Sequence, residues 1–420
     1  MQVGIEAMNA FVGTAFLDVR KLAEYRDLDM DRFNNLLMKQ KSVALPYEDP
    51  ITMAVNAAKP IIDALTPEER DRIEMVITAT ESSFDFGKSM STYIHDLLGL
   101  NRNCRLFELK NACYSGVAAL QTAVNFILSQ ASPGAKALVV ATDISRFMLV
   151  EGEAPSSMEW QFAEPSGGAG AVAALVSEVP SILQLDVGAN GYYGYEVMDT
   201  CRPIADSEAG DADLSLLSYL DCAENSYLEY QKRVPEADYG VTFDYLSFHT
   251  PFGGMVKGAH RNIMRKIMKV SAEEIEEDFK TRVQPGLSYC QRVGNMMGAM
   301  TLFSIFSTIE NGHFKEPKRL GIFSYGSGCC SEFFSGVVLS EGQELMNSLG
   351  FKKNLENRTE LNFDEYHELL LGNNAIKFGT RNFTPDSKFV EKSRSCLGKE
   401  VLFLKEIKEF HREYEWVNGE

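Results

Sequence analysis

The chain has 420 residues, 45% of them hydrophobic, and a formal net charge of −18. This acidic excess argues against nucleic acid as a partner, because such binding depends on Lys and Arg that neutralise phosphates. The N-terminus lacks a basic region followed by an apolar one, and no stretch approaches a membrane span in length. We therefore expect a soluble, cytoplasmic protein that contacts no membrane. The eight cysteines lack zinc-type spacing, so we expect reduced thiols and no metal site.

Apolar stretches of strand length alternate along the chain with longer stretches of helical periodicity. This alternation is typical of an α/β protein in which helices cover the faces of a sheet. The predicted strands span residues 3–10, 73–80, 137–142, 171–176, 182–187 and 319–324. The predicted helices span residues 49–64, 89–98, 114–129 and 295–309. The helix at 114–129 has few polar interruptions, so we expect it to be buried on most sides.

The order of elements repeats between the two parts of the chain. A strand at 73–80 ends at Glu81 before a helix follows Cys113. A second strand, at 241–248, ends at His249 before a helix follows from Asn295. We therefore predict a duplicated fold, with an N-terminal half over residues 1–176 and a C-terminal half over residues 177–420.

Two parts of the C-terminal half have their own predicted character. Gly, Pro and Asp are dense after residue 188, which indicates an inserted irregular connection over about 188–235. The segment from about 341 to 420 contains amphipathic stretches at 364–371 and 402–414. We therefore predict a C-terminal helical segment.

Cys113 lies where a strand and loop lead into the apolar helix at 114–129. Free N–H groups and the positive end of the helix macrodipole favour an ionised sulfur at such a position, and so lower the pKa of the thiol. Cys113 is therefore a candidate nucleophile. The alternative is a small buried hydrophobic side chain, which is how most free cysteines are used.

A cysteine nucleophile needs a partner that manages protons. Among the six histidines His249 is the candidate, because it lies on a loop just past a predicted strand, where functional groups gather in α/β layers. Glu81 has the same placement after its own strand. Burial there raises the pKa of a carboxyl group toward a value that suits a general base. The alternatives are a structural histidine and a solvent-facing glutamate.

Basic residues recur at every fourth position after His249, at Lys257, Arg261, Arg265 and Lys269. On a regular helix this spacing places them on one face. The stripe is therefore a candidate site for a phosphate or an acidic protein, and the alternative is a solvated surface. Two glycine-rich stretches, at 284–295 and 324–330, allow backbone to approach a ligand and offer amide donors.

Five short motifs, taken in order, resemble the active-site segments of 3-hydroxy-3-methylglutaryl-CoA synthases, which are members of the thiolase superfamily. They are Ala-Thr-Glu-Ser at 79–82, Asn-Ala-Cys-Tyr at 111–114, Phe-His-Thr-Pro-Phe at 248–252, Gly-Asn at 294–295 and Ser-Tyr-Gly-Ser-Gly at 324–328. Two further segments, at 190–199 and 289–295, are similar to the synthase-like enzymes of bacterial polyketide β-branching cassettes. In those enzymes acyl-carrier proteins replace coenzyme A as substrate carriers.

The resemblance implies a five-layered αβαβα thiolase fold, a homodimer and roles for individual residues. Cys113 would take an acetyl group from a donor thioester, and Glu81 would remove a proton from the acetyl methyl group. His249 would protonate the new alkoxide or position the acceptor. The resemblance also implies substrate binding by Asn295, Tyr325, Ser327 and Tyr114, and binding of the carrier or its phosphopantetheine by Lys257, Arg261 and Arg265. It implies no bound cofactor, because the phosphopantetheine arm of the carrier, or coenzyme A, delivers the substrates.

The implied partners are a donor acetyl-acyl-carrier protein and an acceptor β-ketoacyl-acyl-carrier protein. Addition of the acetyl carbon to the β-ketone would install a β-branch as a 3-hydroxy-3-carboxymethyl thioester. A base such as Glu81 fits this chemistry, because an addition without decarboxylation requires removal of a weakly acidic proton. Two alternatives remain: a primary-metabolism synthase that uses acetyl-CoA and acetoacetyl-CoA, and a non-catalytic carrier-binding scaffold.

Overall fold

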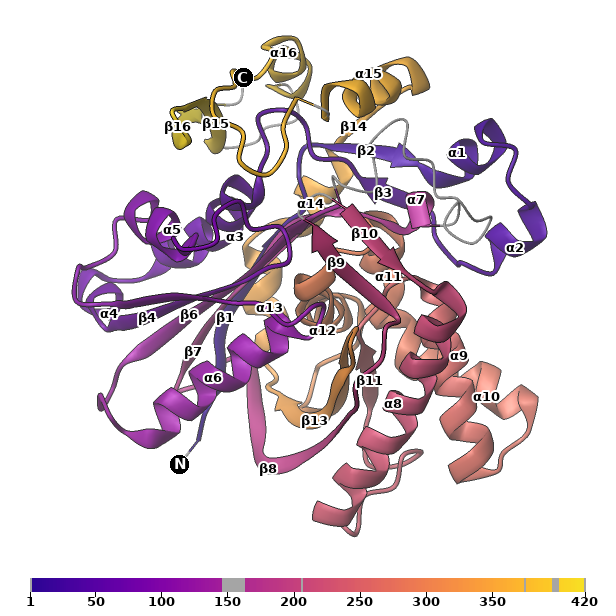
Figure 1. The fold of residues 1–420 in the computed structure, drawn as a ribbon. Helices are drawn as coiled ribbons and strands as arrows, with labels where there is room; N and C mark the ends of the chain where they lie inside the picture. The colour runs from indigo at the N-terminus through magenta and orange to yellow at the C-terminus, as the bar shows by residue number, and fades with distance from the viewer. Residues whose placement is uncertain (1, 146–162, 205–206, 374, 395–399, 419–420) are drawn as a thin grey trace.

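A mixed sheet of nine strands organises the chain in the computed structural model, which describes residues 2–145, 163–204, 207–373, 375–394 and 400–418. The strand order is β5-β4-β6-β7-β1-β8-β13-β12-β11. Figure 1 shows where most of these strands lie in the fold. These strands are β1 (Gly4–Phe11), β4 (Ile73–Ala79), β5 (Arg105–Leu109), β6 (Lys136–Ile144), β7 (Ala169–Ser177), β8 (Leu183–Gly194), β11 (Tyr245–Phe248), β12 (Lys318–Gly326) and β13 (Cys330–Val338).

The two halves of this sheet have matching strand order and direction. β6 runs parallel to β4 and antiparallel to β7, just as β12 runs parallel to β11 and antiparallel to β13. β1 completes the first set beside β7, and β8 completes the second beside β13. The sets join where β1 and β8 pair antiparallel at Ile5 and Leu183. The predicted duplicated α/β fold is thus confirmed, while the boundary at residue 177 stays a prediction.

Three hydrophobic cores separate five layers. The central core lies between the two halves of the sheet and contains α6 and α12. α3 and α5 cover the outer face of the first half, and α8 and α9 cover that of the second. On β12, Ile322 enters the central core and its neighbour Phe323 enters an outer one, because side chains alternate along a strand. The helices are α3 (Pro50–Ala64), α5 (Ser91–Leu97), α6 (Ser115–Ser129), α8 (Ala212–Arg233), α9 (Gly253–Ile263) and α12 (Met300–Asn311).

In the part of the chain that the structure describes, one segment, Ala112–Ser129, has the length and mean hydropathy that a membrane span requires. Most of this segment is α6, whose Val117, Leu120 and Val124 side chains lie in the central core. Burial between the two halves of the protein therefore accounts for its apolar composition.

Shorter elements surround the layers. They are β2 (Ala15–Asp18), α1 (Val19–Tyr25), α2 (Met30–Asn34), β3 (Gln40–Ser42), α4 (Pro67–Asp71), α7 (Ala163–Ser166), β9 (Thr200–Ile204), β10 (Ser207–Gly210), α10 (Ala272–Asp278), α11 (Gln284–Val293), α13 (Gly342–Ser348), α14 (Phe351–Glu356), β14 (Thr359–Glu360), α15 (Phe363–Asn373), α16 (Lys388–Arg394), β15 (Val401–Lys408) and β16 (His411–Val417). Two π-helical turns, Met264–Met268 and Phe279–Val283, follow α9 and α10.

Residues 188–235 are not the irregular connection that their composition predicts. β8 continues to Gly194, which pairs with Cys330 of β13. β9 and β10 then form a hairpin, and α8 occupies the rest of the segment. Pairing with a strand more than a hundred residues away orders the start of this segment, and local composition carries no sign of such pairing.

The C-terminal segment is only partly helical, so that prediction is wrong in part. Residues 402–414 form the β15–β16 hairpin instead of an amphipathic helix, whereas the stretch at 364–371 is helical as α15. Glu409 and Phe410 turn the hairpin with φ values of 47° and 69°. Such a turn usually carries Asn-Gly or Asp-Gly, and its absence hides the hairpin in the sequence.

Two other predicted elements begin later than expected. The strand predicted at 241–248 spans only Tyr245–Phe248, and Val241 is 83% exposed. The helix predicted from Asn295 begins at Met300, after a short 3₁₀ turn at Met297–Ala299. The second difference leaves Asn295, a residue of the candidate site, on a loop rather than in a helix.

A buried ion pair fixes the C-terminal hairpin to α3. The Arg412 guanidinium donates to Asp49 at 2.9 Å, and both side chains are 6% exposed. We expect Arg412→Ala to lower the free energy of unfolding by about 3 kcal/mol, because it leaves a carboxylate buried without its charged partner. Urea denaturation followed by circular dichroism measures this loss. In the control Arg381→Ala, whose exposed pair with Glu409 is removed, the change should stay within about 1 kcal/mol; equal losses would contradict the prediction.

Candidate active site

Cys113 sits on a strained connection between β5 and α6. The preceding residue, Ala112, has a φ of 44°, which is unusual for a residue with a side chain. The amide of Ser115 donates to the Ala112 carbonyl at 3.1 Å as the helix begins. The thiol is half-buried. Strain of this kind concentrates at functional sites, and here it fixes the direction of the one residue that follows it.

The electrostatic surroundings of the thiol differ from the prediction. Burial raises the pKa of Cys113 well above its ordinary value, and the nearby carboxylates of Glu81 and Asp143 raise it further. The expectation that a helix start lowers this pKa is therefore wrong, because burial and the nearby carboxylates raise it. The resting nucleophile is therefore a neutral thiol beside the carboxyl group of Glu81.

Glu81 follows β4 and lies beside this thiol. Burial raises the pKa of its carboxyl group, while the positive charge of Arg202 and the Cys113 thiol lower it. Arg202 Nη2 lies 3.6 Å from Glu81 Oε2, and within the described residues Oε1 is buried without a hydrogen-bond partner. The raised pKa agrees with the sequence analysis. A carboxylate with one free oxygen can accept a proton from a group placed against it.

Asp143, at the end of β6, was missed by the sequence analysis. One carboxylate oxygen accepts from the Glu81 amide at 2.7 Å and from the hydroxyls of Thr80 and Ser82 at 3.0 and 2.8 Å. The other accepts from the Gly298 amide of the C-terminal half at 2.9 Å. Burial and the charge of Glu81 raise the pKa of Asp143 to about 7. The signal was available, since polar residues end two neighbouring parallel strands, β4 and β6.

His249 follows β11 and is only 1% exposed. Its backbone is held on both sides, because its amide donates to Phe323 at 2.8 Å and its carbonyl accepts from the Tyr219 hydroxyl at 2.6 Å. Burial lowers the pKa of the imidazole to about 3, so His249 is neutral at neutral pH. Nδ1 has no hydrogen-bond partner among the described residues. A neutral ring can donate or accept one hydrogen bond without titrating.

The glycine-rich turn between β12 and β13 packs against the nucleophile loop. A Cβ atom on Gly326 would lie 2.7 Å from the Tyr114 amide nitrogen, so only glycine permits this approach. Behind it, a Cβ on Gly116 would lie 2.1 Å from the Gly298 carbonyl oxygen. The start of α6 therefore contacts the 3₁₀ turn that precedes α12. The two halves meet directly at Cys113.

Other predicted substrate-binding residues are engaged within the protein. The Tyr114 hydroxyl donates to Glu332 at 2.7 Å, and the Tyr325 hydroxyl donates to Asp199 at 2.5 Å. The Asn295 side chain accepts from the Met297 amide at 2.9 Å. The polar groups of these three side chains therefore already have hydrogen-bond partners within the protein. Ser327 is half-buried in the turn that follows β12.

The basic stripe is not one regular helix face. Lys257 and Arg261 lie on α9, but Arg265 lies in the π-helical turn that follows, and Lys269 ends it with a φ of 56°. Lys257 Nζ is 2.5 Å from Glu276 Oε1, so an acidic side chain already partners it. Arg261 and Arg265 are exposed. The four-residue spacing predicts a single face only where the helix stays regular.

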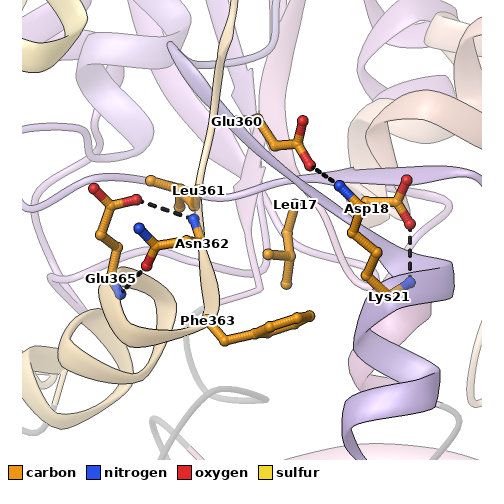
Figure 2. A pocket seen from close by; sticks show the side chains of 8 residues that line it. All are labelled: Leu17, Asp18, Lys21, Glu360, Leu361, Asn362, Phe363 and Glu365. Atoms are coloured by element: carbon orange, nitrogen blue, oxygen red, sulfur yellow. Dashed lines mark hydrogen bonds and ion pairs between the residues drawn. The ribbon is translucent and has the colours of Figure 1, made fainter.

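A separate surface pocket of about 330 Å³ lies between β2, α1, β14 and α15 (Figure 2). The polar side chains that line it interact with one another. Lys21 Nζ is 2.6 Å from Glu360, and the side chains of Asn362 and Glu365 each accept a hydrogen bond from the other's backbone N–H. None of the predicted site residues lines it. Within the described ranges, no group of three His, Cys, Asp or Glu side chains is arranged to hold a metal ion.

Comparison with known families identifies the chain. Residues 1–180 match the family model for the N-terminal part of hydroxymethylglutaryl-coenzyme A synthase, and residues 258–416 match the model for its C-terminal part. The chain belongs to the hydroxymethylglutaryl-CoA synthase family. The resemblance of the five motifs is thus confirmed. Cys113 and Glu81 lie in the N-terminal matched region, and His249 lies between the two matched regions.

This synthase is similar to members from two metabolic settings. It is 63% identical over 419 residues to the polyketide biosynthesis 3-hydroxy-3-methylglutaryl-ACP synthase PksG of Bacillus subtilis (strain 168), with all of both chains covered. It is 34% identical to the hydroxymethylglutaryl-CoA synthase of Enterococcus faecalis, over 88% of this chain and 91% of that one. The sequence is therefore much nearer to PksG than to this coenzyme A enzyme.

Solved structures show the same ranking. The synthase matches the curacin biosynthetic pathway HMG synthase in complex with acetyl donor-ACP with a TM-score of 0.95 and 62% identity, covering 99% of this chain and 100% of that one. The match to MvaS in complex with 3-hydroxy-3-methylglutaryl coenzyme A has a TM-score of 0.84 and 27% identity, with 99% of each chain covered. Such overlap over the whole chain confirms the five-layered thiolase-like fold of this synthase.

Proposed function

We propose that this synthase installs β-branches during polyketide assembly, using acyl-carrier proteins as donor and acceptor carriers. The observation that carries the proposal is the placement of Glu81 beside the Cys113 thiol. Its oxygen Oε1 is buried and has no hydrogen-bond partner among the described residues. The chain's 63% identity to PksG supports carriers rather than coenzyme A as the substrates' holder. The proposed enzyme is a cytoplasmic homodimer whose two halves, 1–176 and 177–420, share one active site.

The reaction begins with acyl transfer. The Cys113 sulfur attacks the acetyl thioester of the donor carrier, the carrier's thiol leaves with the proton, and acetyl-Cys113 forms. Glu81 then removes a proton from the acetyl methyl group. The resulting enolate carbon adds to the β-ketone of the acceptor and leaves an alkoxide that must gain a proton. Water finally cleaves the Cys113 thioester, which releases a carboxymethyl branch and restores the thiol.

His249 positions the acceptor in this scheme. Its ring is neutral because burial lowers its pKa to about 3, so it donates a hydrogen bond to the ketone oxygen as negative charge develops there. The proton that finally neutralises the alkoxide then comes from a group other than His249, and Glu81 holds one after it has removed the methyl proton. Asn295, Ser327, Tyr114 and Tyr325 shape the pocket around the thioester, the two tyrosines through their rings because their hydroxyls are engaged.

Mass spectrometry of the intact enzyme tests the acyl transfer. After incubation with acetyl-loaded donor carrier, we expect one acetyl group on the wild-type enzyme and none on Cys113→Ala. Absence of acetyl from folded wild-type enzyme would sink the catalytic assignment and favour a carrier-binding scaffold. A second comparison measures condensation with substrates on carriers and on coenzyme A. Faster turnover with coenzyme A in both roles would instead identify a primary-metabolism synthase.

We expect Arg261 to contribute to carrier binding more than Lys257. Arg261 is exposed, whereas Lys257 already forms an ion pair with Glu276. Arg261→Glu should therefore weaken binding of the acidic donor carrier about tenfold, mostly by slowing association, with little change in acylation by a small acetyl thioester. Titration of labelled carrier at two salt concentrations measures this loss. Equal affinity in Arg261→Glu and wild type would remove α9 from the carrier-binding surface.

A further inference from the structure

The β9–β10 hairpin joins the candidate base to the opposite half of the protein. Within the described residues, β9 and β10 form a two-stranded sheet of their own, which is not part of the nine-stranded sheet (Figure 1). Asp199, just before β9, is fully buried and accepts hydrogen bonds from the Tyr325 hydroxyl and the Gly328 amide. The start of the hairpin is therefore fixed to the turn that packs against the nucleophile loop. From this fixed position, the Arg202 side chain extends to Glu81.

Arg202 contacts Glu81 in two unequal ways. Its Nη1 donates to the backbone carbonyl of Glu81 at 2.5 Å. Its Nη2 lies 3.6 Å from the carboxylate oxygen Oε2, which is longer than the usual 2.7–2.9 Å of a charge-assisted hydrogen bond. Both side chains are 16% exposed. The guanidinium thus makes a close contact with the backbone of Glu81 and a longer one with its carboxylate.

A second acidic residue of the hairpin, Glu208, adds its charge to this pair. Its Oε2 is buried and has no hydrogen-bond partner in the described part of the chain. Burial raises the pKa of Glu208, and Arg202 lowers it, so the two groups interact. The charge of Glu208 also raises the pKa of Glu81 and of Cys113. The positive charge of Arg202 therefore acts on both carboxyl groups, Glu81 and Glu208.

We propose that Arg202 is a positioning residue for Glu81 and that Glu208 offsets its charge, so that Glu81 is oriented without being locked into a strong ion pair. This inference rests on the proposed function of Glu81 as base. A carboxylate held by two short bonds to arginine is a weak base, because the ion pair stabilises its charged form. Here the backbone contact supplies the orientation, and Oε1 has no hydrogen-bond partner among the described residues.

The charged and titratable groups that face Glu81 come from several elements. Arg202 and Glu208 belong to the hairpin, Cys113 to the loop before α6, and Asp143 to β6. The two hairpin residues act on Glu81 with opposite sign. Replacing Arg202 with glutamine removes a positive charge and should move the ionisation of Glu81 to higher pH. Replacing Glu208 with glutamine removes a negative charge and should move it to lower pH.

The test compares full-length Arg202→Gln, Arg202→Lys and Glu208→Gln with wild type, with Arg381→Gln as the matched control at an exposed ion pair. Infrared difference spectra across a pH range report the ionisation of Glu81, once its carboxyl band is assigned by its loss in Glu81→Gln. We expect the midpoint to shift up in Arg202→Gln and down in Glu208→Gln. In Arg202→Gln condensation should fall about a hundredfold, because a small displacement of the base costs that much, while acetyl transfer falls far less and Arg202→Lys recovers part of the rate.

The outcomes separate this inference from the proposed function. Opposite midpoint shifts with selective loss of condensation would support the positioning role. Midpoints equal to wild type in both variants, or shifts in the same direction, would overturn it. A wild-type enzyme that takes up acetyl but does not condense would refute the proposed function of Glu81, and the infrared midpoints would still decide whether the hairpin controls its ionisation.

Discussion

Replacement of Glu81 by glutamine should leave acetyl transfer to Cys113 intact and lower the rate of condensation by two to four orders of magnitude, the typical contribution of a general base. Glutamine keeps the shape of the side chain but cannot accept the methyl proton. Intact-protein mass spectrometry measures the acetyl enzyme, and a single-turnover assay with acceptor-loaded carrier measures condensation. Near wild-type condensation by the variant would show that another group is the base.

Glu310→Gln is a suitable control, because burial also raises the pKa of Glu310 and one of its buried oxygens has no hydrogen-bond partner in the described ranges. Glu310 lies on α12 and accepts a hydrogen bond from the Tyr289 hydroxyl. We expect the Glu310→Gln enzyme to catalyse condensation at the wild-type rate. The pH profile gives a second check. The pKa of Glu81 is raised, and only its ionised form removes a proton, so condensation by wild type should fall as the pH drops through that raised pKa. Glu81→Gln should lose this acidic limb.

Replacement of His249 by asparagine should reduce condensation by about two to three orders of magnitude while acetyl transfer survives, as expected when one donor to a developing oxyanion is removed. The KM for the acceptor should rise as well, because the same hydrogen bond orients the ketone. Steady-state kinetics with varied acceptor carrier measures both quantities. His313→Asn, at an exposed histidine, serves as the control.

The pH dependence of this variant distinguishes the two roles considered for His249. Because the pKa of its ring is lowered to about 3, no change of its charge takes place between pH 6 and 9. The profile of His249→Asn should therefore be parallel to that of wild type over this range. Loss of a wild-type limb in the variant would show instead that His249 titrates and acts as a general acid.

Periodicity and apolar runs were sufficient to predict most of the layered framework. The strands at 73–80 and 171–176 and the helix at 114–129 are nearly continuous apolar stretches because they are buried on both sides. Elements whose stability comes from distant partners were missed. The end of β8 depends on β13, and the β15–β16 hairpin turns through two residues without a turn signature.

The sequence predicted the main residues of the site but not the charged groups that surround them. Placement after strands and before a helix indicated Glu81, His249 and Cys113. The raised pKa of Cys113 could not be predicted, since it depends on burial and on carboxylates that the fold brings from other strands. The partners of Glu81 illustrate the same limit: Arg202 lies 121 residues away in the sequence, within a segment predicted to be irregular.

The contact between Gly116 and the Gly298 carbonyl has a consequence for engineering. Cys113 and Glu81 come from the first half, whereas His249 and Arg202 come from the second, so acceptor and carrier preferences can change in one half while acetyl chemistry is retained in the other. Chimeras that exchange the second half between related synthases should therefore tolerate variation on α8 and α9. They should fail wherever the new second half replaces Gly298 with a larger residue, because a Cβ there would lie 2.2 Å from the Ser115 hydroxyl of the first half.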